Sequence, residues 1–372
     1  MRIGDREIGV DFPPYVIAEI GVNHDGEVTR ALELTDAAAD AGADAVKLQF
    51  FETDRLMSKA AKLAAYQRNA GETDPIEMLR RLELTIDEME LVVDRAHERG
   101  IHAIVTVFST ELVEIAETLA WDAYKSASPD IVNKPLLEAM ARTGKPMIVS
   151  TGASTLDEIV QAVGWLDNAR DRLAVLQCVS CYPAPDSALG GITAIADATG
   201  LVVGYSDHTA ELETGQMACV WGARVLEKHI TYDRLAPGPD HQASLIASLE
   251  LRRYIELSCA HTILSEAFCV ATGHSKGVST DNVAGYLSAM NMAEQTATQK
   301  RVLDCERDVR EVSRQSVVSV ESISAGTTIT RGMLAIKRPG TGILAYRLDE
   351  VVGRTAARDI DGDVPIVEED LQ

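Results

Sequence analysis

The sequence predicts a (β/α)8 barrel followed by a small, mostly β domain. Residues 15–264 alternate between short apolar runs and amphipathic helical stretches, and eight such units fit into about 250 residues. The alternation stops after residue 264, and from residue 313 onward short β-like runs are separated by turns. A doubly wound open sheet is the alternative, but no GxGxxG motif follows the first apolar run, which weakens that alternative.

The eight predicted strands are the apolar runs themselves. They cover residues 15–21, 45–50, 103–108, 122–128, 147–152, 173–179, 201–207 and 225–230. The predicted helices between them include residues 29–41, 111–119 and 156–166. Thr155, with Glu158 three residues later, is a typical helix start, because each side chain can bond the other's backbone amide. A longer piece, 52–85, follows the second strand and is expected to be a lid over the barrel mouth or a decorative insertion.

The chain is expected to divide into a barrel over residues 1–264, a linker over 265–312 and a small domain over 313–372. The linker is polar and mixed in composition, with several glycines and a charged run before the small domain. The small domain carries the β-like runs 316–320, 327–329, 334–336 and 363–366. About 60 residues are too few to build an enzyme alone, so chemistry is expected in the barrel.

Composition excludes several classes of partner. A net charge of −22 would repel the phosphates of nucleic acids and of membrane surfaces. No run approaches the roughly 18 apolar residues needed to span a bilayer, and residues 1–5 lack the apolar core of a signal peptide. Six cysteines without regular spacing fit a reducing compartment. We therefore expect a cytoplasmic protein that binds neither nucleic acid nor membrane.

Polar residues gather at the carboxyl ends of the predicted strands, where barrels carry their chemistry. One lysine in an apolar strand could extend its ammonium group to solvent. Three of them, Lys47, Lys125 and Lys228, are harder to explain that way, because burying an unpaired ammonium is costly. Together with hydroxyls they would suit a phosphorylated, carboxylated substrate; these hydroxyls belong to Thr106, Ser128, Ser150 and Ser206. Glu19 is then the acidic partner, either of a cation or of a substrate hydroxyl.

Two histidines end the last two strands. His208 and His229 could hold one divalent cation between them, or they could be unrelated surface residues. A Gly/Pro-rich loop with Asp240 and His241 follows. In the small domain, residues 337–342 place two cations before a rigid turn, which could grip an anion or a carbonyl group or could simply be solvated.

Six ordered motifs resemble the sialic acid synthase family, which includes N-acetylneuraminate, legionaminate and pseudaminate synthases. They lie at residues 18–26, 42–49, 150–152, 205–208, 238–241 and 337–340, and the first reads Ala-Glu-Ile-Gly-Val-Asn-His-Asp-Gly. The resemblance implies a TIM barrel followed by an antifreeze-like (SAF) domain. The stretch 265–310 is the least family-like part.

The resemblance also implies a reaction. Phosphoenolpyruvate would condense with the open-chain aldehyde of an N-acylated mannosamine-type sugar, consuming water and releasing phosphate. His208 and His229 would hold a divalent cation, typically Mn²⁺, with Mg²⁺ or Co²⁺ also considered, and this cation would polarise the aldehyde oxygen.

Site residues follow from the resemblance by position. Phosphoenolpyruvate would be held by Lys47, Thr106, Lys125, Ser128, Ser150 and Ser206. The sugar and the attacking water would face Glu19, Gln49, Tyr182 and Asp240. Glu19, Lys47 and Lys125 are the predicted catalytic residues. Ser180 stands where neuraminate synthases carry Asn, and its hydroxyl can still bind phosphate, whereas Lys228 could balance charge or contact substrate.

In the family the small domain reaches into the partner's active site, so the resemblance implies a domain-swapped homodimer. Arg338 would then contact the N-acyl group of the sugar across the interface. Two other readings stay open: a class I aldolase with a Schiff base on Lys47, Lys125 or Lys228, and a non-catalytic carbohydrate-binding protein. The first motif favours the neuraminate and legionaminate branches over the pseudaminate branch, but it does not separate those two.

Overall fold

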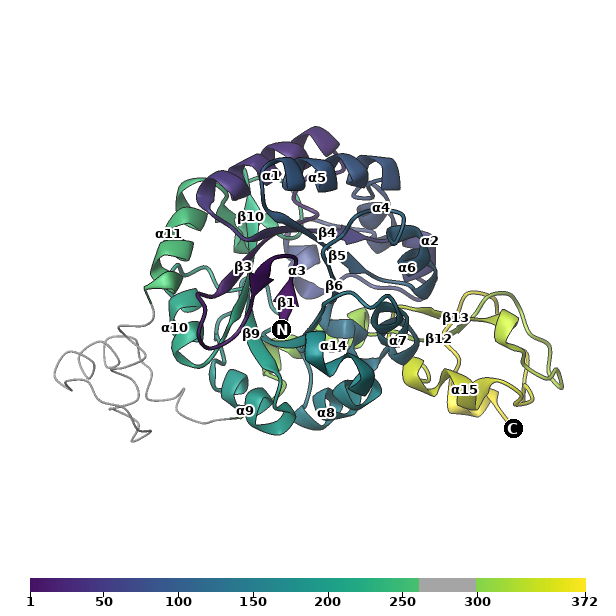
Figure 1. Ribbon diagram of the computed structural model, residues 1–372. Coiled ribbons are helices and arrows are strands. Elements are labelled where there is room, and N and C mark those ends of the chain that lie inside the picture. The colour runs from purple at the N-terminus through teal and green to yellow at the C-terminus, as the bar shows by residue number, and fades with distance from the viewer. Residues whose placement is uncertain (261–298) are drawn as a thin grey trace.

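Eight parallel strands close into a barrel at the centre of the molecule (Figure 1). The structure is a computed structural model that describes residues 1–260 and 299–372. The barrel strands are β3 (Tyr15–Gly21), β4 (Ala45–Phe50), β5 (His102–Val107), β6 (Ala123–Ser126), β7 (Met147–Ser150), β8 (Leu173–Cys178), β9 (Val202–Asp207) and β10 (Val225–Thr231). They pair in chain order, and β10 closes the ring by pairing with both β9 and β3. The prediction of a (β/α)8 barrel is confirmed.

Helices surround the barrel and fill the lid region. The described α-helices are α1 (Val28–Ala41), α2 (Thr53–Leu56), α3 (Ala65–Asn69), α4 (Pro75–Arg80), α5 (Ile86–Glu98), α6 (Thr110–Ala116), α7 (Lys134–Arg142), α8 (Leu156–Trp165), α9 (Gly190–Thr199), α10 (Thr214–Val220), α11 (Leu249–Cys259), α14 (Arg307–Ser313) and α15 (Leu348–Val351). The predicted start of α8 is present, because Thr155 and Glu158 cap the helix reciprocally. No helix in the described part of the chain is long and apolar enough to cross a membrane.

The barrel interior has an apolar lower half and a polar upper half. Side chains two residues apart on a strand point to the same face. Each inward-facing apolar position is therefore followed, two residues later, by an inward-facing polar or thiol position. These pairs are Ile17/Glu19, Ala45/Lys47, Ile104/Thr106, Ala123/Lys125, Ile148/Ser150, Leu176/Cys178, Gly204/Ser206 and Val225/Glu227. The reactive groups thus meet at the carboxyl end of the barrel.

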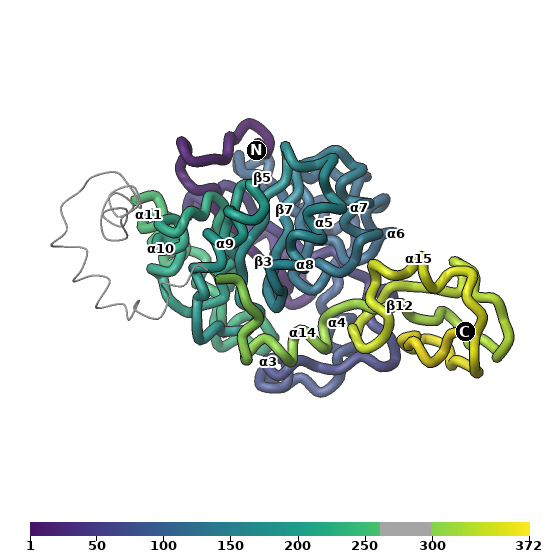
Figure 2. The backbone as a smooth tube through the Cα atoms, turned by 90° about the horizontal axis from the view of Figure 1, so that it is seen from below, coloured from purple at the N-terminus to yellow at the C-terminus, as the bar shows by residue number. Residues whose placement is uncertain are grey.

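The opposite end of the barrel is closed by a short hairpin that the sequence did not predict. Strands β1 (Arg2–Ile3) and β2 (Arg6–Glu7) place Ile3 and Ile8 against the lower barrel layer. Figure 2 shows the N-terminus at one end of the barrel and helices α3 and α14 at the other. Access to the polar half is therefore from the side of α3 and α14.

The C-terminal domain has a core of its own beside the barrel (Figure 1). Strands β12 (Ser316–Ser319) and β13 (Leu334–Lys337) pair antiparallel, whereas the predicted strands at 327–329 and 363–366 form only isolated bridges. These two segments are too irregular to continue a ladder, because turns interrupt them on both sides. A further unpredicted strand, β11 (Leu245–Ile246), extends β10. Of the predicted linker, only residues 299–312 lie within the described ranges.

Candidate active site

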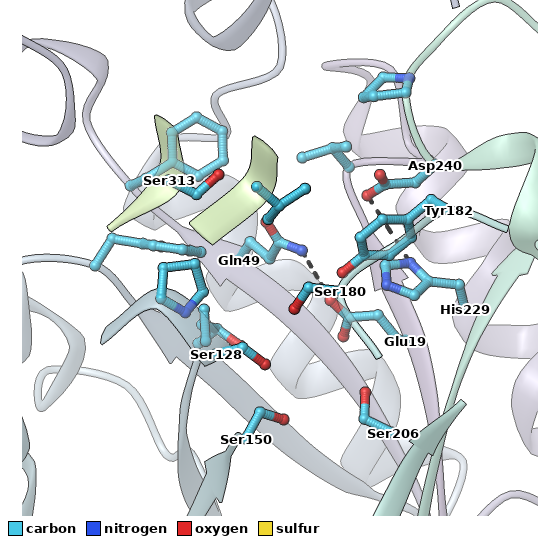
Figure 3. Close-up of a pocket in the computed structure, with 18 of the residues that line it drawn as sticks. Glu19, Gln49, Ser128, Ser150, Ser180, Tyr182, Ser206, His229, Asp240 and Ser313 are labelled. Atoms are coloured by element: carbon cyan, nitrogen blue, oxygen red, sulfur yellow. Dashed lines mark hydrogen bonds and ion pairs between the residues drawn. The ribbon is translucent and has the colours of Figure 1, made fainter. Parts of the chain in front are cut away.

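One pocket at the carboxyl end of the barrel brings together every site residue predicted from the sequence. These are Glu19, Lys47, Gln49, Thr106, Lys125, Ser128, Ser150, Ser180, Tyr182, Ser206, His208, His229, Asp240 and Arg338. Ten of the residues around this pocket are labelled in Figure 3. The parallel register explains much of the clustering, because His229, Glu19 and Lys47 are successive partners across β10, β3 and β4.

Alternating charges cross the floor of the pocket. Lys47 Nζ lies 2.7 Å from Glu19 Oε2 and 3.7 Å from Glu227 Oε2. Lys125 Nζ lies 3.6 Å from Glu227 Oε1. All four side chains are buried, and burial raises the pKa of Glu19. Burial opposes ionisation of Glu227 as well, but Lys125 and Lys47 lower its pKa to about 2, so Glu227 is a permanent anion between two ammonium groups.

The two lysines differ in their proton affinity. Burial alone would lower the pKa of Lys47, but Glu19 and Glu227 together raise it above its usual value. Burial lowers the pKa of Lys125, with Glu227 as the largest opposing influence. Lys228 points to the other face of β10, away from the pocket, where its Nζ lies 3.3 Å from Asp207 Oδ2. Of the three lysines in the predicted strands, two therefore face the pocket.

Five hydroxyls surround the lysines, and we call this group the hydroxyl cradle. It consists of Thr106, Ser128, Ser150, Ser180 and Ser206. Lys47 donates to the Thr106 hydroxyl at 2.7 Å, and Lys125 donates to the Ser150 hydroxyl at 2.6 Å. Ser206 donates to Glu227 Oε1 at 2.8 Å. A Cβ on Gly152 would lie 2.1 Å from the Ser180 hydroxyl oxygen, so the cradle needs a glycine there.

The two histidines lie side by side above the cradle. Their ring centroids are 5.7 Å apart. Nδ1 of His208 is 2.7 Å from the carbonyl oxygen of Val179, which fixes this nitrogen as the donor and leaves Nε2 facing Ser206 at 3.4 Å. Nδ1 of His229 is buried without a hydrogen-bond partner, and burial holds the pKa of this imidazole well below its usual value.

This donor set fits an open divalent-cation site. Imidazole nitrogens suit such ions, and the orphaned nitrogen of His229 is the unsatisfied polar atom that a ligand would explain. Within residues 1–260 and 299–372, no group of three His, Cys, Asp or Glu side chains could hold a metal. The protein would therefore supply two ligands and leave the other positions to substrate and water oxygens.

Asp240 faces His229, with its Oδ2 3.9 Å from Nδ1 (Figure 3). Burial and the nearby Glu19 raise the pKa of Asp240 to about 7. The loop that carries Asp240 is tied to the first motif, because Ser244 donates to the Asp240 carbonyl at 2.7 Å and accepts from Asn23 at 2.9 Å.

A second contact ties the same two motifs together. His241 lies outside the pocket, with Nε2 2.9 Å from Asp25 Oδ1 and Nδ1 2.7 Å from the Thr231 hydroxyl. The first motif and the loop with Asp240 and His241 thus pack on each other. Asp240 is held over the pocket by backbone contacts rather than by its own carboxylate.

The lid, the small domain, helix α14 and the loops that follow β3, β4 and β5 build the outer wall of the pocket. Tyr66 and Gln67 of α3 line it, which agrees with the lid expected over residues 52–85. Arg338 reaches the pocket of its own chain: its amide donates to the Leu56 carbonyl at 2.9 Å, and its guanidinium lies 5.6 Å from the Phe108 ring. Most of this wall is apolar, and its apolar members are Val22, Phe51, Leu56, Met78, Leu79, Leu82, Phe108 and Val309.

Sequence reasoning missed three acidic or thiol groups beside the pocket. Glu227 lies two residues before His229 on β10, so both side chains face the same side of the strand. This spacing could have identified Glu227 from the sequence. Cys178 also follows this period; burial alone would raise the pKa of its thiol, but His208 and Ser128 lower it. Asp130 has no hydrogen-bond partner for either carboxyl oxygen, and burial raises its pKa to about 7, with Arg338 as the largest opposing influence. No local pattern distinguishes Asp130, because its environment comes from the small domain.

Comparison with known proteins identifies the family. Residues 34–263 match the NeuB family, and residues 314–372 match the SAF domain. The chain belongs to the NeuB family. An N,N'-diacetyllegionaminic acid synthase from Legionella pneumophila is 31% identical, with 99% of this chain and 98% of the relative covered. One from Campylobacter jejuni is 32% identical over 92% of this chain and 96% of the relative.

Two solved structures share the fold of this chain. The spore coat polysaccharide biosynthesis protein SpsE from Bacillus subtilis superposes with a TM-score of 0.79 at 28% identity, covering 100% of this chain and 99% of that chain. An N-acetylneuraminic acid synthetase from Leptospira borgpetersenii gives a TM-score of 0.63 at 28% identity, covering 79% and 97%. The recognition of the sialic acid synthase family and of the SAF domain is confirmed.

Proposed function

We propose that this protein is a nonulosonic acid synthase, which joins phosphoenolpyruvate to an open-chain N-acylated amino sugar and releases phosphate. One observation carries the proposal: two buried lysines and five hydroxyls face two buried histidines across a single pocket in a member of the NeuB family. An anion site and an electrophile site are therefore adjacent. This adjacency is what a condensation between a phosphorylated enol and an aldehyde requires.

The lysine side of the pocket would hold phosphoenolpyruvate. Lys47 and Lys125 supply charge to the phosphate and carboxylate groups, and the hydroxyl cradle supplies short hydrogen-bond donors. Lys125 gives its proton up more easily than an exposed lysine does. Glu227 fixes both ammonium groups between the strands and accepts from Ser206, which orients that hydroxyl.

His208 and His229 would hold a divalent cation, for which we propose Mn²⁺, with Mg²⁺ and Co²⁺ as alternatives. Such an ion, when bound, would polarise the aldehyde oxygen of the sugar. Cys178 raises the pKa of His208 against the effect of burial, so the neutral imidazole that a metal ion needs would compete with the protonated form. Tyr182 stacks 4.1 Å from the His208 ring and would limit the orientations of the sugar.

The bonds and protons of the proposed reaction balance as follows. The C3 carbon of phosphoenolpyruvate forms a bond with the aldehyde carbon, and the aldehyde oxygen takes up a proton. A water oxygen then bonds to C2 and loses one proton. The C2–O bond to phosphate breaks with its electron pair, the second proton leaves the water-derived oxygen, and C2 becomes a carbonyl. The two water protons are thus balanced by one on the new alcohol and one on the released phosphate. Asp240, whose pKa of about 7 lets it hold or release a proton near neutrality, can serve the aldehyde oxygen. Glu19, bound to Lys47 and Gln49, can orient the water.

The outer wall supports a narrower choice of acceptor. We propose a 2,4-diacetamido-2,4,6-trideoxy sugar rather than N-acetylmannosamine, because eight apolar side chains line the wall and a methyl group there is favoured over a hydroxymethyl group. The two legionaminic acid synthases among the relatives support the same choice. The ratio of kcat/KM values for the two sugars should favour the trideoxy sugar by about 10- to 200-fold. A ratio below one would refute this acceptor.

Phosphate release from phosphoenolpyruvate, measured with a panel of amino sugars and divalent ions, tests the main proposal. Turnover with one sugar that is abolished by a chelator and restored by Mn²⁺ is the expected result. No phosphate release with any sugar or ion would refute the proposal and would favour a non-catalytic carbohydrate-binding role. Irreversible loss of activity on borohydride treatment with substrate would instead support an aldolase with a Schiff base on Lys47 or Lys125.

The proposal includes a cytoplasmic location and a homodimer. The five cysteines in the described ranges are free thiols, which suits a reducing compartment. In this structure Arg338 lines the pocket of its own chain. Exchange of the small domain between two chains therefore stays a prediction.

A further inference from the structure

Residues 300–314, which we call the strap, lead into the small domain and cross the barrel mouth. They contain a 3-10 turn at Asp304–Glu306 and helix α14. Arg310 and Arg314 both bind Glu158 at the start of α8, with N–O distances of 2.8 Å and 2.6 Å. The strap is thereby fixed over the ends of β7 and β8.

Glu306 makes the most specific contact of the strap. Its side chain is buried, with 1% of the residue exposed. One carboxylate oxygen, Oε1, accepts from the Ala153 amide at 2.6 Å and from the Ser180 amide at 2.8 Å. The other oxygen accepts from the Leu303 amide at 2.8 Å within the strap. A single oxygen atom therefore sets the spacing between the loops that follow β7 and β8.

These two loops position two of the five cradle hydroxyls. Ser180 belongs to the cradle itself, and the Gly152 amide, next to Ala153, donates to the Ser128 hydroxyl at 2.9 Å. Packing around Gly152 is tight, because an added Cβ would lie 2.1 Å from the Ser180 hydroxyl and 2.9 Å from the Ser128 hydroxyl. A small shift of either loop would thus move both hydroxyls.

Lys300 is a further buried charge of the strap. It is 7% exposed, and its Nζ lies 3.5 Å from the Cys178 carbonyl at the end of β8. Burial lowers the pKa of Lys300, and Glu306 is the largest opposing influence. Neither residue lines the pocket. Lys300 and Glu306 thus lie behind the cradle, where an uncompensated carboxylate would repel a bound phosphate.

We propose that Glu306 is a positioning residue for the phosphate-binding half of the site, with Lys300 as its counter-charge. The proposal rests on the function proposed above. It implies that the spacing of the loops after β7 and β8, which Glu306 sets, decides how well the cradle hydroxyls fit phosphoenolpyruvate. On the histidine side only the Val179 carbonyl, which binds His208, shares a peptide group with the Ser180 amide, so sugar binding should depend on Glu306 less than phosphoenolpyruvate binding does.

Steady-state kinetics of the full chain test whether Glu306 affects the KM for phosphoenolpyruvate more than the KM for the sugar. Glu306→Ala should raise the KM for phosphoenolpyruvate about tenfold or more, since it removes two hydrogen bonds to a charged acceptor. The KM for the sugar should rise by a smaller factor, because Glu306 reaches the histidine side only through the peptide group that joins Val179 and Ser180. Glu306→Asp keeps the charge but is too short to reach both amides, so it should give the same pattern even if the alanine variant folds poorly. Glu306→Gln keeps an acceptor oxygen for both amides and should rescue most of the affinity.

Inorganic phosphate, as a competitive inhibitor against phosphoenolpyruvate, provides a second readout. Lys300→Met should weaken phosphate inhibition, and combining it with Glu306→Gln should restore part of that loss because the repelling charge is gone. Glu158→Gln is the matched control: it loosens the strap without touching the two amides, so it should lower the melting temperature without selective loss of phosphoenolpyruvate affinity.

Three results would overturn the proposal. They are an equal rise of both KM values in the Ala and Asp variants, an unchanged KM for phosphoenolpyruvate in either variant, and the same selective loss in Glu158→Gln. A wild-type protein that does not consume phosphoenolpyruvate would instead refute the proposed function, so the two failures are distinguishable.

Discussion

Replacing Asp130 by Asn should stabilise the protein, and the gain should grow with pH. This carboxyl group is fully buried near Arg338, and burial raises its pKa from an ordinary 3.8 to about 7. The folded state therefore keeps a proton that the unfolded state has already lost. Stability is lost as pH rises from 3.8 to about 7 and stays lost above that range, because ionising the buried group carries the cost.

The size of this effect follows from proton linkage. Between the two pKa values, each rise of one pH unit lowers the contribution of Asp130 to the free energy of unfolding by about 1.4 kcal/mol. The free energy of unfolding of Asp130→Asn minus that of the wild type should therefore grow by about 2 kcal/mol between pH 5 and pH 7. Urea unfolding at both pH values measures the difference, and other buried groups cancel in it. Asp54→Asn, on a side chain that is 86% exposed, is the control and should show no such trend. A difference that is flat or shrinks with pH would refute the assignment of Asp130 as a buried, protonated group.

Other consequences of the site can be tested separately. Substituting His208 or His229 by Ala should abolish turnover and weaken Mn²⁺ binding measured by calorimetry; full activity in both variants would remove the metal site. Arg338→Ala should raise the KM for the sugar far more than that for phosphoenolpyruvate. Mixing Arg338→Ala and Glu19→Ala chains, at a sugar concentration too low for either variant to turn over alone, should restore activity if two chains share their sites, so no recovery would argue against domain exchange. Gly152→Ala should lower activity about 100-fold, because the new methyl group displaces cradle hydroxyls by an ångström or more; near-normal kinetics would show that the cradle is not needed.

The sequence predicted the barrel and the pocket residues for the same physical reason. Strand periodicity places residues two apart on one face, so an apolar run that ends in polar residues indicates both a strand and its active end. Lys47, Thr106 and Lys125 all follow this rule and all reach the pocket. Lys228 is the informative exception, because it lies one residue out of phase with His229 and points to the helices instead.

The contacts that sequence reasoning missed depend on residues far apart in the chain. Glu306 gains its role from amides at Ala153 and Ser180, and nothing near residue 306 indicates this. Asp130 is unusual because it is buried near Arg338, a residue far away in the chain. Periodicity predicts which face a side chain occupies, but it does not predict which distant segment will pack on that face.

The charge pattern on the pocket floor affects how fast the donor can be captured. Lys47 and Lys125 are matched by Glu19 and Glu227, so the empty floor presents no net positive field to the outside. A phosphoenolpyruvate anion must then approach a protein of net charge −22. Since dissolved ions screen repulsion beyond about 10 Å at 0.1 M salt, added salt should speed this encounter rather than slow it. A bimolecular rate constant that rises from low to moderate ionic strength in stopped-flow binding would be the signature of a site that attracts its anion only after the anion has entered.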